Sequence, residues 1–291
     1  MLLKRVSRSF YLSVRLLHAP MRRGVCLGYL LARASDTLAD AQKNPELLED
    51  FAGWLNGGPP MRLPDPPPGD DGERELIACL PEVFLWLDAM PASEAALVRE
   101  VLRTIIGGQQ LDMRRFAEAD RGRVVWLADE TELDDYAWRV AGCVGRFWTR
   151  LGFEVLGARF SRMRPAELEA LGIRFGKGLQ LVNILRDVSA DLAHGRGYLP
   201  VADANDVPAA HAAWEQVARG YLADGLVYAD AMKLKRLHVA VSLPARLGIE
   251  TLDAMRAAGP VALRERVKVA RRHVWWNLAA AWKSSLSPGG G

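Results

Sequence analysis

Hydrophobic positions recur at intervals of three and four residues along most of the chain, and polar residues fill the positions between them. This period is typical of helices that bury one face. The pattern predicts helices over residues 2–17, 21–40, 73–87, 93–119, 132–156, 165–193, 211–228, 232–256 and 260–282. No segment shows the alternation of a half-buried strand or a hairpin signal, and no internal repeat is visible. The sequence therefore predicts an all-α protein.

Two segments interrupt the helical pattern. Residues 56–72 read NGGPPMRLPDPPPGDDG. Such a density of Pro and Gly excludes helix and strand, so we expect an exposed loop there. Residues 194–208 form a second long connection. Because no shift of composition divides the chain, we expect one helical domain over residues 1–283 and a frayed tail over residues 284–291.

Composition and charge narrow the class of protein. The chain has 291 residues, of which 50% are hydrophobic, enough for a sizeable core. Its net charge of +3 gives no reason to expect nucleic acid as a partner. The cysteines Cys26, Cys79 and Cys143 lie far apart, which argues against a zinc site or a disulfide framework and favours the reducing cytoplasm.

No apolar run is long enough to span a membrane and no signal peptide is recognisable. Peripheral contact with the inner face of a membrane stays open, and the oligomeric state is not predicted.

Two acidic pairs stand at the C-terminal ends of predicted apolar helices. Asp36 and Asp40 in the first pair, like Asp187 and Asp191 in the second, are four residues apart and therefore share one helix face. The helix dipole places partial negative charge at these ends, which disfavours acids by roughly 0.3–1 kcal/mol each. A bound cation would offset that cost.

Magnesium is the cation that suits two such pairs. It binds through one or two carboxylates and fills its octahedron with water and phosphate oxygens. Two facing pairs could therefore hold magnesium ions against a diphosphate and neutralise it as a leaving group. Taken alone, each pair also fits an ordinary solvated helix end, because acids four residues apart are common on exposed faces.

The surrounding sequence favours the metal site over that alternative. Four segments, in this order, resemble the signature motifs of the squalene and phytoene synthase family: SRSF at 7–10, YLLARASDTLAD at 29–40, YAWRVAGCVG at 136–145 and GLQLVNILRDVSADLAHGRGYLP at 178–200. The resemblance implies a single-domain class I isoprenoid synthase fold, in which helices surround a central active-site cavity. It also implies a prenyltransferase that joins two molecules of farnesyl diphosphate head to head through presqualene diphosphate.

The resemblance also implies roles for individual residues. The acids expected to bind Mg²⁺ are Asp36, Asp40, Asp187 and Asp191. Tyr136 matches the central tyrosine, which can accept a proton or face a carbocation. The positions expected to bind the substrates are Ser7, Arg8, Ser9, Phe10, Tyr29, Arg33, Gln180, Asn183, Arg186, Arg196 and Tyr198. Without the motifs, the aromatic residues would be interpreted as core, the amides as satisfied polar groups and the arginines as surface ion pairs.

The C-terminal third bears on the product. Segments 237–252 and 267–273 resemble squalene synthases more than phytoene synthases, which implies that NADPH reduces the second carbocation to squalene. Lys268 and Arg271 are the positions expected to hold the NADPH phosphate, although Ala270 stands where a further basic residue is common. A phytoene or dehydrosqualene synthase, which loses a proton instead, and a presqualene diphosphate synthase, which omits the reduction, are the alternatives. A helical binding protein without turnover is a further one, and the intact acids argue against it.

Overall fold

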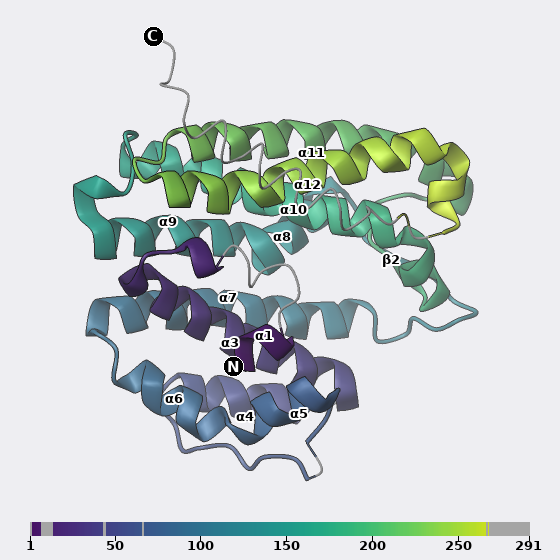
Figure 1. Ribbon diagram of the computed structural model, residues 1–291. Coiled ribbons are helices and arrows are strands. Elements are labelled where there is room, and N and C mark those ends of the chain that lie inside the picture. Colours follow the sequence, from purple (N-terminus) through teal and green to yellow (C-terminus); the bar gives the residue numbers. More distant parts are fainter. Residues whose placement is uncertain (1, 7–13, 43–44, 66, 266, 268–291) are drawn as a thin grey trace.

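The computed structural model describes residues 2–6, 14–42, 45–65, 67–265 and 267. Its α-helices, in chain order, are α1 (Leu2–Val6), α3 (Ala19–Gln42), α4 (Pro45–Leu55), α5 (Asp71–Ala78), α6 (Leu80–Asp88), α7 (Ala92–Arg115), α8 (Glu130–Ala137), α9 (Cys143–Leu156), α10 (Pro165–Ala193), α11 (Val207–Asp230) and α12 (Lys235–Ala258). Figure 1 shows them in layers, with α10–α12 at the top, α8 and α9 below them, α3 and α7 in the middle and α4–α6 at the bottom.

The prediction of an all-α, single-domain protein is confirmed. Within the described ranges the only strands are β1 (Val125–Trp126) and β2 (Arg196–Gly197), which pair in parallel. The sequence pattern did not predict them, because two residues are too few to show an alternation. No helix in the part of the chain described here is both long and apolar enough to cross a membrane.

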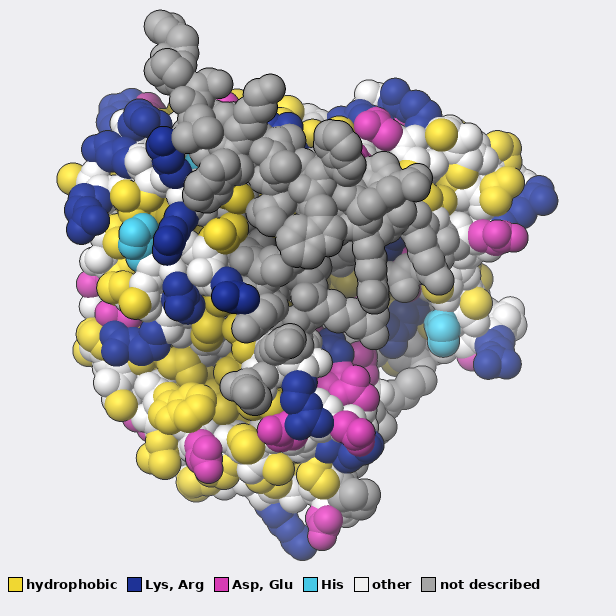
Figure 2. Space-filling view, in the orientation of Figure 1, with side chains coloured by type: hydrophobic (Ala, Val, Ile, Leu, Met, Phe, Trp, Pro, Cys, Tyr) yellow, Lys and Arg dark blue, Asp and Glu magenta, His cyan; other side chains and the backbone are white. Residues whose placement is uncertain are grey.

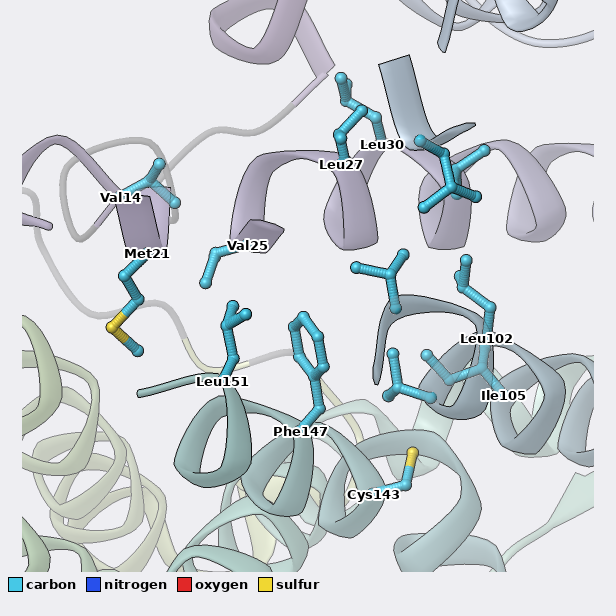
Figure 3. Close-up of a cluster of buried hydrophobic side chains, with 14 of the residues drawn as sticks. Val14, Met21, Val25, Leu27, Leu30, Leu102, Ile105, Cys143, Phe147 and Leu151 are labelled. Carbon is cyan, nitrogen blue, oxygen red and sulfur yellow. The ribbon is translucent and has the colours of Figure 1, made fainter. Parts of the chain in front are cut away.

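The principal core lies where α3 packs against α7 and α9. Met21 and Val25 on α3 point toward Leu151 and Phe147 on α9 (Figure 3). The inward positions of α3 therefore recur at the helical period, as the sequence pattern predicts. This packing fixes the axis of the helix that carries the first acidic pair.

α10 is the central helix of the other half, where it packs against α9, α11 and α12. Its contact with α9 is made backbone to backbone. A Cβ atom added at Gly145 would lie 1.9 Å from the carbonyl oxygen of Gly172, and one added at Gly176 would lie 2.2 Å from the carbonyl oxygen of Ala141. Only glycine allows this approach, so the two helices are held at a fixed spacing.

The single helix predicted over residues 73–87 is wrong: this segment forms two helices, α5 and α6, that meet at Cys79. Pro81 lies in the first turn of α6, where a missing N–H breaks no hydrogen bond. α5 begins at a capping box, in which Asp70 accepts from the backbone N–H of Glu73 and the Glu73 side chain accepts from the N–H of Asp70. The loop expected before it is confirmed and mostly exposed.

Other boundaries also differ from the prediction. α4 was not predicted. The helix predicted over 132–156 contains a π-helical turn, Trp138–Gly142, between α8 and α9, a feature that is frequent at functional sites. The first predicted helix, over 2–17, does not run through to Leu17, which lies in a bend. The last, over 260–282, starts instead as a 3₁₀ turn, Gly259–Leu263, because Gly259 with φ 57° ends α12. Its remainder beyond residue 267 and the expected tail over 284–291 lie outside the described residues.

Candidate active site

One acid of each predicted pair, Asp36 on α3 and Asp191 on α10, is partly desolvated, whereas Asp40 is exposed. Burial, reinforced by the neighbouring charge of Asp40, raises the pKa of Asp36 from 3.8 to about 6. Burial and the adjacent Asp187 likewise raise the pKa of Asp191 to about 6. Desolvation and like charge both favour the neutral carboxyl. The site therefore disfavours its own negative charge and gains from a nearby cation.

Asp112 on α7 links the two pairs, and no motif pointed to it. Its charge acts on Asp191, while the charge of Asp40 acts on it, so carboxylates from three helices share one field. Its Oδ2 accepts a hydrogen bond from the Tyr198 hydroxyl at 2.9 Å. Its Oδ1 is buried and receives no hydrogen bond from the described residues. Burial raises the pKa of Asp112, and Arg196 opposes the rise.

Gln109, one turn before Asp112 on α7, is a second residue that the motifs missed. Its Nε2 donates to Asp36 Oδ1 at 2.5 Å and to the Ser35 hydroxyl at 3.0 Å. For Asp112, the sequence did contain a signal. Asp112 continues the series of inward-facing positions Ile105 and Gly108 on α7, and an apolar residue is expected at such a position. A carboxylate at such a position needs a partner or a ligand.

Tyr136 and Tyr198 form an aromatic pair beside the acids. Their rings are stacked with centroids 4.6 Å apart, and Phe116 lies edge-on to Tyr198 at 5.1 Å. Burial raises the pKa of Tyr136 well above its usual value, and the charges of Tyr198, Asp112 and Asp191 raise it further. Tyr136 therefore stays a neutral phenol that faces carboxylates.

The short β-sheet positions Arg196 and Tyr198. The backbone N–H of Val125 donates to the Gly195 carbonyl at 2.8 Å, and that of Leu127 donates to the Gly197 carbonyl at 2.9 Å. Gly195 has φ 77°, and a Cβ there would lie 2.3 Å from the carbonyl oxygen of Asp120. The glycines of the GRG segment thus let the chain turn back after α10 and return two side chains to the acids.

Arg33 shares the face of α3 with Asp36, as the sequence predicts, but its partner is a carboxylate from another helix. It forms a partly buried ion pair with Glu73 in the first turn of α5. Tyr29, one turn earlier, donates its hydroxyl to the carbonyl of Val6 at 3.0 Å. This hydrogen bond joins the end of α1 to α3.

Three further predicted residues lie on α10 before or within the second acidic pair. Arg186 donates from Nε and Nη2 to the two carboxylate oxygens of Asp187, at 3.0 and 2.5 Å. Asn183 is exposed, and its Nδ2 donates to Gln180 Oε1 at 3.4 Å. The structure therefore brings Arg186 and Asp187 into direct contact, whereas Gln180 and Asn183 contact each other.

An apolar cavity of about 290 Å³ lies among α9, α10, α11 and α12. It is lined by Ala141, Val144, Gly145, Trp148, Gly172, Phe175, Gly176, Leu179, Tyr228, Ala240, Val241, Leu243, Pro244 and Leu247. Along α10, the lining positions Gly172, Gly176 and Leu179 continue at spacings of three and four to Asn183 and Asp187. The cavity and the second acidic pair therefore share one face of this helix.

Six predicted positions cannot be located. Ser7, Arg8, Ser9 and Phe10, and the two NADPH positions Lys268 and Arg271, all lie outside the described residues. On the face shown in Figure 2, acidic side chains (magenta) and basic side chains (dark blue) lie close together.

The carboxylates fit a magnesium site in which the protein supplies some of the metal ligands and the diphosphate supplies others. No three His, Cys, Asp or Glu side chains in the described ranges surround a common point as a complete metal site would. Magnesium does not require one, because it takes one or two carboxylates and completes its shell with water and phosphate oxygens. The raised pKa values of Asp36 and Asp191 and the unpaired Oδ1 of Asp112 are the features that a cation would relieve.

Residues 3–273 match the sequence family described as squalene/phytoene synthase. The chain belongs to this family. Its members are prenyltransferases that join two isoprenoid diphosphates head to head with a divalent metal. The recognition made from the four motifs is thereby confirmed.

Individual relatives differ in the product that they make. The chain is 32% identical over 200 residues to the presqualene diphosphate synthase of Rhodopseudomonas palustris, covering 66% of this chain and 58% of the relative. It is 28% identical over 268 residues to the bifunctional lycopene cyclase/phytoene synthase of Phaeosphaeria nodorum, covering 89% of this chain and 42% of the relative. The chain thus spans about half the length of these curated relatives.

A solved structure supports the fold. The complex of TcSQS with the ligand BPH1237 superimposes with a TM-score of 0.76 at 20% identity, covering 98% of this chain and 84% of that chain. The predicted class I isoprenoid synthase fold is confirmed by this likeness.

Proposed function

We propose that this protein condenses two molecules of farnesyl diphosphate head to head to presqualene diphosphate and reduces that intermediate with NADPH to squalene. One observation carries the proposal. Carboxylates from three helices gather at one end of a helix face whose other end lines an apolar cavity. A prenyl diphosphate needs these two environments within the length of one molecule.

The first step breaks an allylic carbon–oxygen bond. Asp36, Asp40, Asp187 and Asp191 would hold magnesium, which when bound neutralises the charge that develops on the departing diphosphate. Arg33 and Arg196 stand beside these acids and supply fixed guanidinium groups for phosphate oxygens. The apolar lining keeps water away from the cation that remains.

The cation then forms a bond with the double bond of the second prenyl chain. Loss of one proton closes the cyclopropane ring, and the second diphosphate stays attached. We assign Tyr136 to this step, because its neutral ring can face the carbocation and stabilise it. Tyr198 stacks on Tyr136 and already donates to Asp112, so these groups form a path from the reacting carbon to a carboxylate that can accept a proton.

The reductive step rests on the sequence resemblance alone. Squalene forms only if the second diphosphate also leaves; NADPH, when bound, would supply the hydride that quenches the resulting cation, and Lys268 and Arg271 would hold its phosphate. Proton loss in place of reduction would give a dehydrosqualene or phytoene type of product. The names of the relatives in Rhodopseudomonas palustris and Phaeosphaeria nodorum favour presqualene diphosphate and phytoene as competing products.

Product analysis with farnesyl diphosphate and magnesium, with and without NADPH, tests the proposal. Squalene formed only with NADPH supports the full sequence of steps. Presqualene diphosphate or a dehydrogenated polyene in both reactions would overturn the reductive step and keep the condensation. Absence of any released diphosphate would overturn the condensation as well.

The products are apolar, so we also infer that a cytoplasmic enzyme of this kind delivers them by peripheral contact with a membrane. Sedimentation of the protein with liposomes at low salt tests this inference. A protein that stays in the supernatant with both neutral and anionic vesicles would contradict it.

A further inference from the structure

Two short segments at one end of the helical layers carry basic side chains and no acidic ones. Residues 157–164 join α9 to α10, and residues 231–236 join α11 to the first turn of α12. All of their basic residues are exposed. We call this set the basic end, and its members are Arg159, Arg162, Arg164, Lys233, Lys235 and Arg236.

The backbone holds the two segments side by side. The N–H of Arg162 donates to the Ala231 carbonyl at 2.9 Å, and the N–H of Lys233 donates to the Phe160 carbonyl at 3.2 Å. The Arg162 guanidinium also donates to the Met232 carbonyl at 3.1 Å. The cations of the two segments therefore belong to one fixed surface.

The start of α3 extends this surface. Met21 points toward Leu151 on α9 (Figure 3), and the glycine that follows Leu151 lies against the Phe160 ring. α3 brings the exposed residues Arg15 and Arg22, and no acid occurs over residues 14–35. Basic side chains (dark blue) accordingly predominate along the left edge of Figure 2, the end at which α3 and α12 begin in Figure 1.

Few of these charges are neutralised within the protein. Arg164 forms an ion pair with Glu167, whereas the other five members of the basic end form none with any carboxylate of the described ranges. Lys235 and Arg236 also stand in the first turn of α12, which contains no acid. The helix dipole places partial positive charge there and disfavours cations, so an external anion would stabilise this end.

The surroundings of the basic end favour a lipid surface as the source of that anion. Val227, in the last turn of α11 and four residues before Ala231, is 46% exposed. Tyr228, which follows it, lines the apolar cavity. A single-stranded nucleic acid would require exposed aromatic rings for base stacking, and in the described ranges the only exposed Trp, Phe or Tyr is Trp86 on α6.

We propose that the basic end is the surface by which this protein binds a membrane, through the headgroups of anionic lipids. Each Lys or Arg near such a surface strengthens binding about fivefold. The inference rests on the membrane contact inferred under the proposed function, and it adds which surface binds and which lipid charge is required.

The experiment measures cosedimentation of the full chain with vesicles of phosphatidylcholine, alone or mixed with phosphatidylglycerol. The unsubstituted protein should bind the mixed vesicles, release them as salt is raised and ignore the neutral ones. The triple variant Arg159→Gln, Lys235→Gln, Arg236→Gln should lower the partition coefficient on the order of a hundredfold. These three side chains are exposed and form no hydrogen bond or ion pair with described residues, so the fold should be retained.

The matched control removes the same net charge elsewhere. Arg62, Arg121 and Arg264 are also exposed and form no ion pair with described carboxylates. Their triple replacement by Gln should change the partition coefficient by less than about threefold, because distant charges are screened. Equal losses in both triple variants would show that net charge alone attracts the protein, and would overturn the assignment of the basic end.

A short DNA duplex added as a soluble competitor tests the other class of polyanion. Binding of the duplex that equals binding to mixed vesicles, and is lost in the same triple variant, would overturn the membrane as partner. Failure of the unsubstituted protein to bind mixed vesicles would overturn the inference outright.

Diphosphate release from farnesyl diphosphate, measured without vesicles, separates this inference from the proposed function. None of the three substituted side chains lies at the candidate active site, so release should be unchanged in the triple variant. Normal release together with undiminished vesicle binding in that variant would refute the basic end alone. Absence of release in every protein, with vesicle binding that still depends on the basic end, would refute the reaction alone.

Discussion

Arg33 on α3 forms an ion pair with Glu73, a residue forty positions away in the first turn of α5. The same Glu73 side chain closes the capping box of α5 by accepting from the backbone N–H of Asp70 at 2.9 Å. One carboxylate therefore has two roles: one oxygen caps a helix, and the other pairs with an arginine that is expected to bind diphosphate. The Pro- and Gly-rich loop before α5 is thus connected to the active site.

We expect Glu73→Gln to separate the capping of α5 from the ion pair with Arg33. A glutamine oxygen can still accept from Asp70, because Gln also completes a capping box, but the charge that orients Arg33 is lost. The KM for farnesyl diphosphate should rise about fivefold, which corresponds to about 1 kcal/mol, with little change in kcat. Steady-state kinetics of diphosphate release measures both values.

Asp70→Ala is the control for that experiment. It removes the cap and should lower the free energy of unfolding by about 1 kcal/mol, with KM nearly unchanged. An equal rise of KM in both variants would mean that Glu73 acts only through the stability of α5.

Asp112→Asn should slow diphosphate release about a hundredfold or more, as should Asp36→Asn and Asp187→Asn, because each removes a negative charge that holds the metal. The asparagine oxygen can still accept from the Tyr198 hydroxyl, so the fold should be retained. Asp65→Asn, in the exposed loop before α5, should be fully active. Unchanged release in the Asp112 variant would return this residue to a structural role in holding Tyr198.

The raised pKa values of Asp36 and Asp191 predict a distinctive dependence of stability on pH. Because the folded pKa of about 6 exceeds the ordinary value of 3.8, the folded state holds these protons more tightly than the unfolded state. The stability due to the protonated carboxyls is present at low pH and is lost as the pH rises from about 4 through about 6. Denaturant unfolding should show this fall, and Asp36→Asn with Asp191→Asn should flatten it.

Magnesium should reverse that loss. Its carboxylate ligands must be deprotonated, so the rise in melting temperature caused by magnesium should be larger at pH 7.5 than at pH 5. Calcium, which prefers more ligands and a looser shell, serves as the comparison ion. Equal magnesium effects at both pH values would contradict a carboxylate site.

Tyr136→Phe should lower kcat more than it raises KM. The phenyl ring keeps the stacking on Tyr198 and can still face a cation, but the hydroxyl that borders the acids is lost. Single-turnover measurement of cyclopropane formation tests the expected loss directly. A fully active variant would leave Tyr136 with a structural role only, in stacking on Tyr198.

The sequence predicted local features well and distant contacts poorly. The helix of the second acidic pair was predicted with the bounds observed for α10, because its period and the Pro165 start are local signals. Asp112 and Glu73 were not predicted, because their importance comes from contacts with residues 86 and 40 positions away. The split at Cys79 was missed, since both α5 and α6 follow the same apolar period.

The backbone contact between α9 and α10 affects how any survey of inactive variants will be interpreted. Gly145 and Gly172 line the cavity, yet even a methyl group at Gly145 would collide with the opposite main chain. Substitutions there will abolish activity by forcing the helices apart, although neither residue touches a reacting group. Such variants will resemble active-site knockouts in an activity screen, and only a parallel measurement of folded protein will separate the two classes.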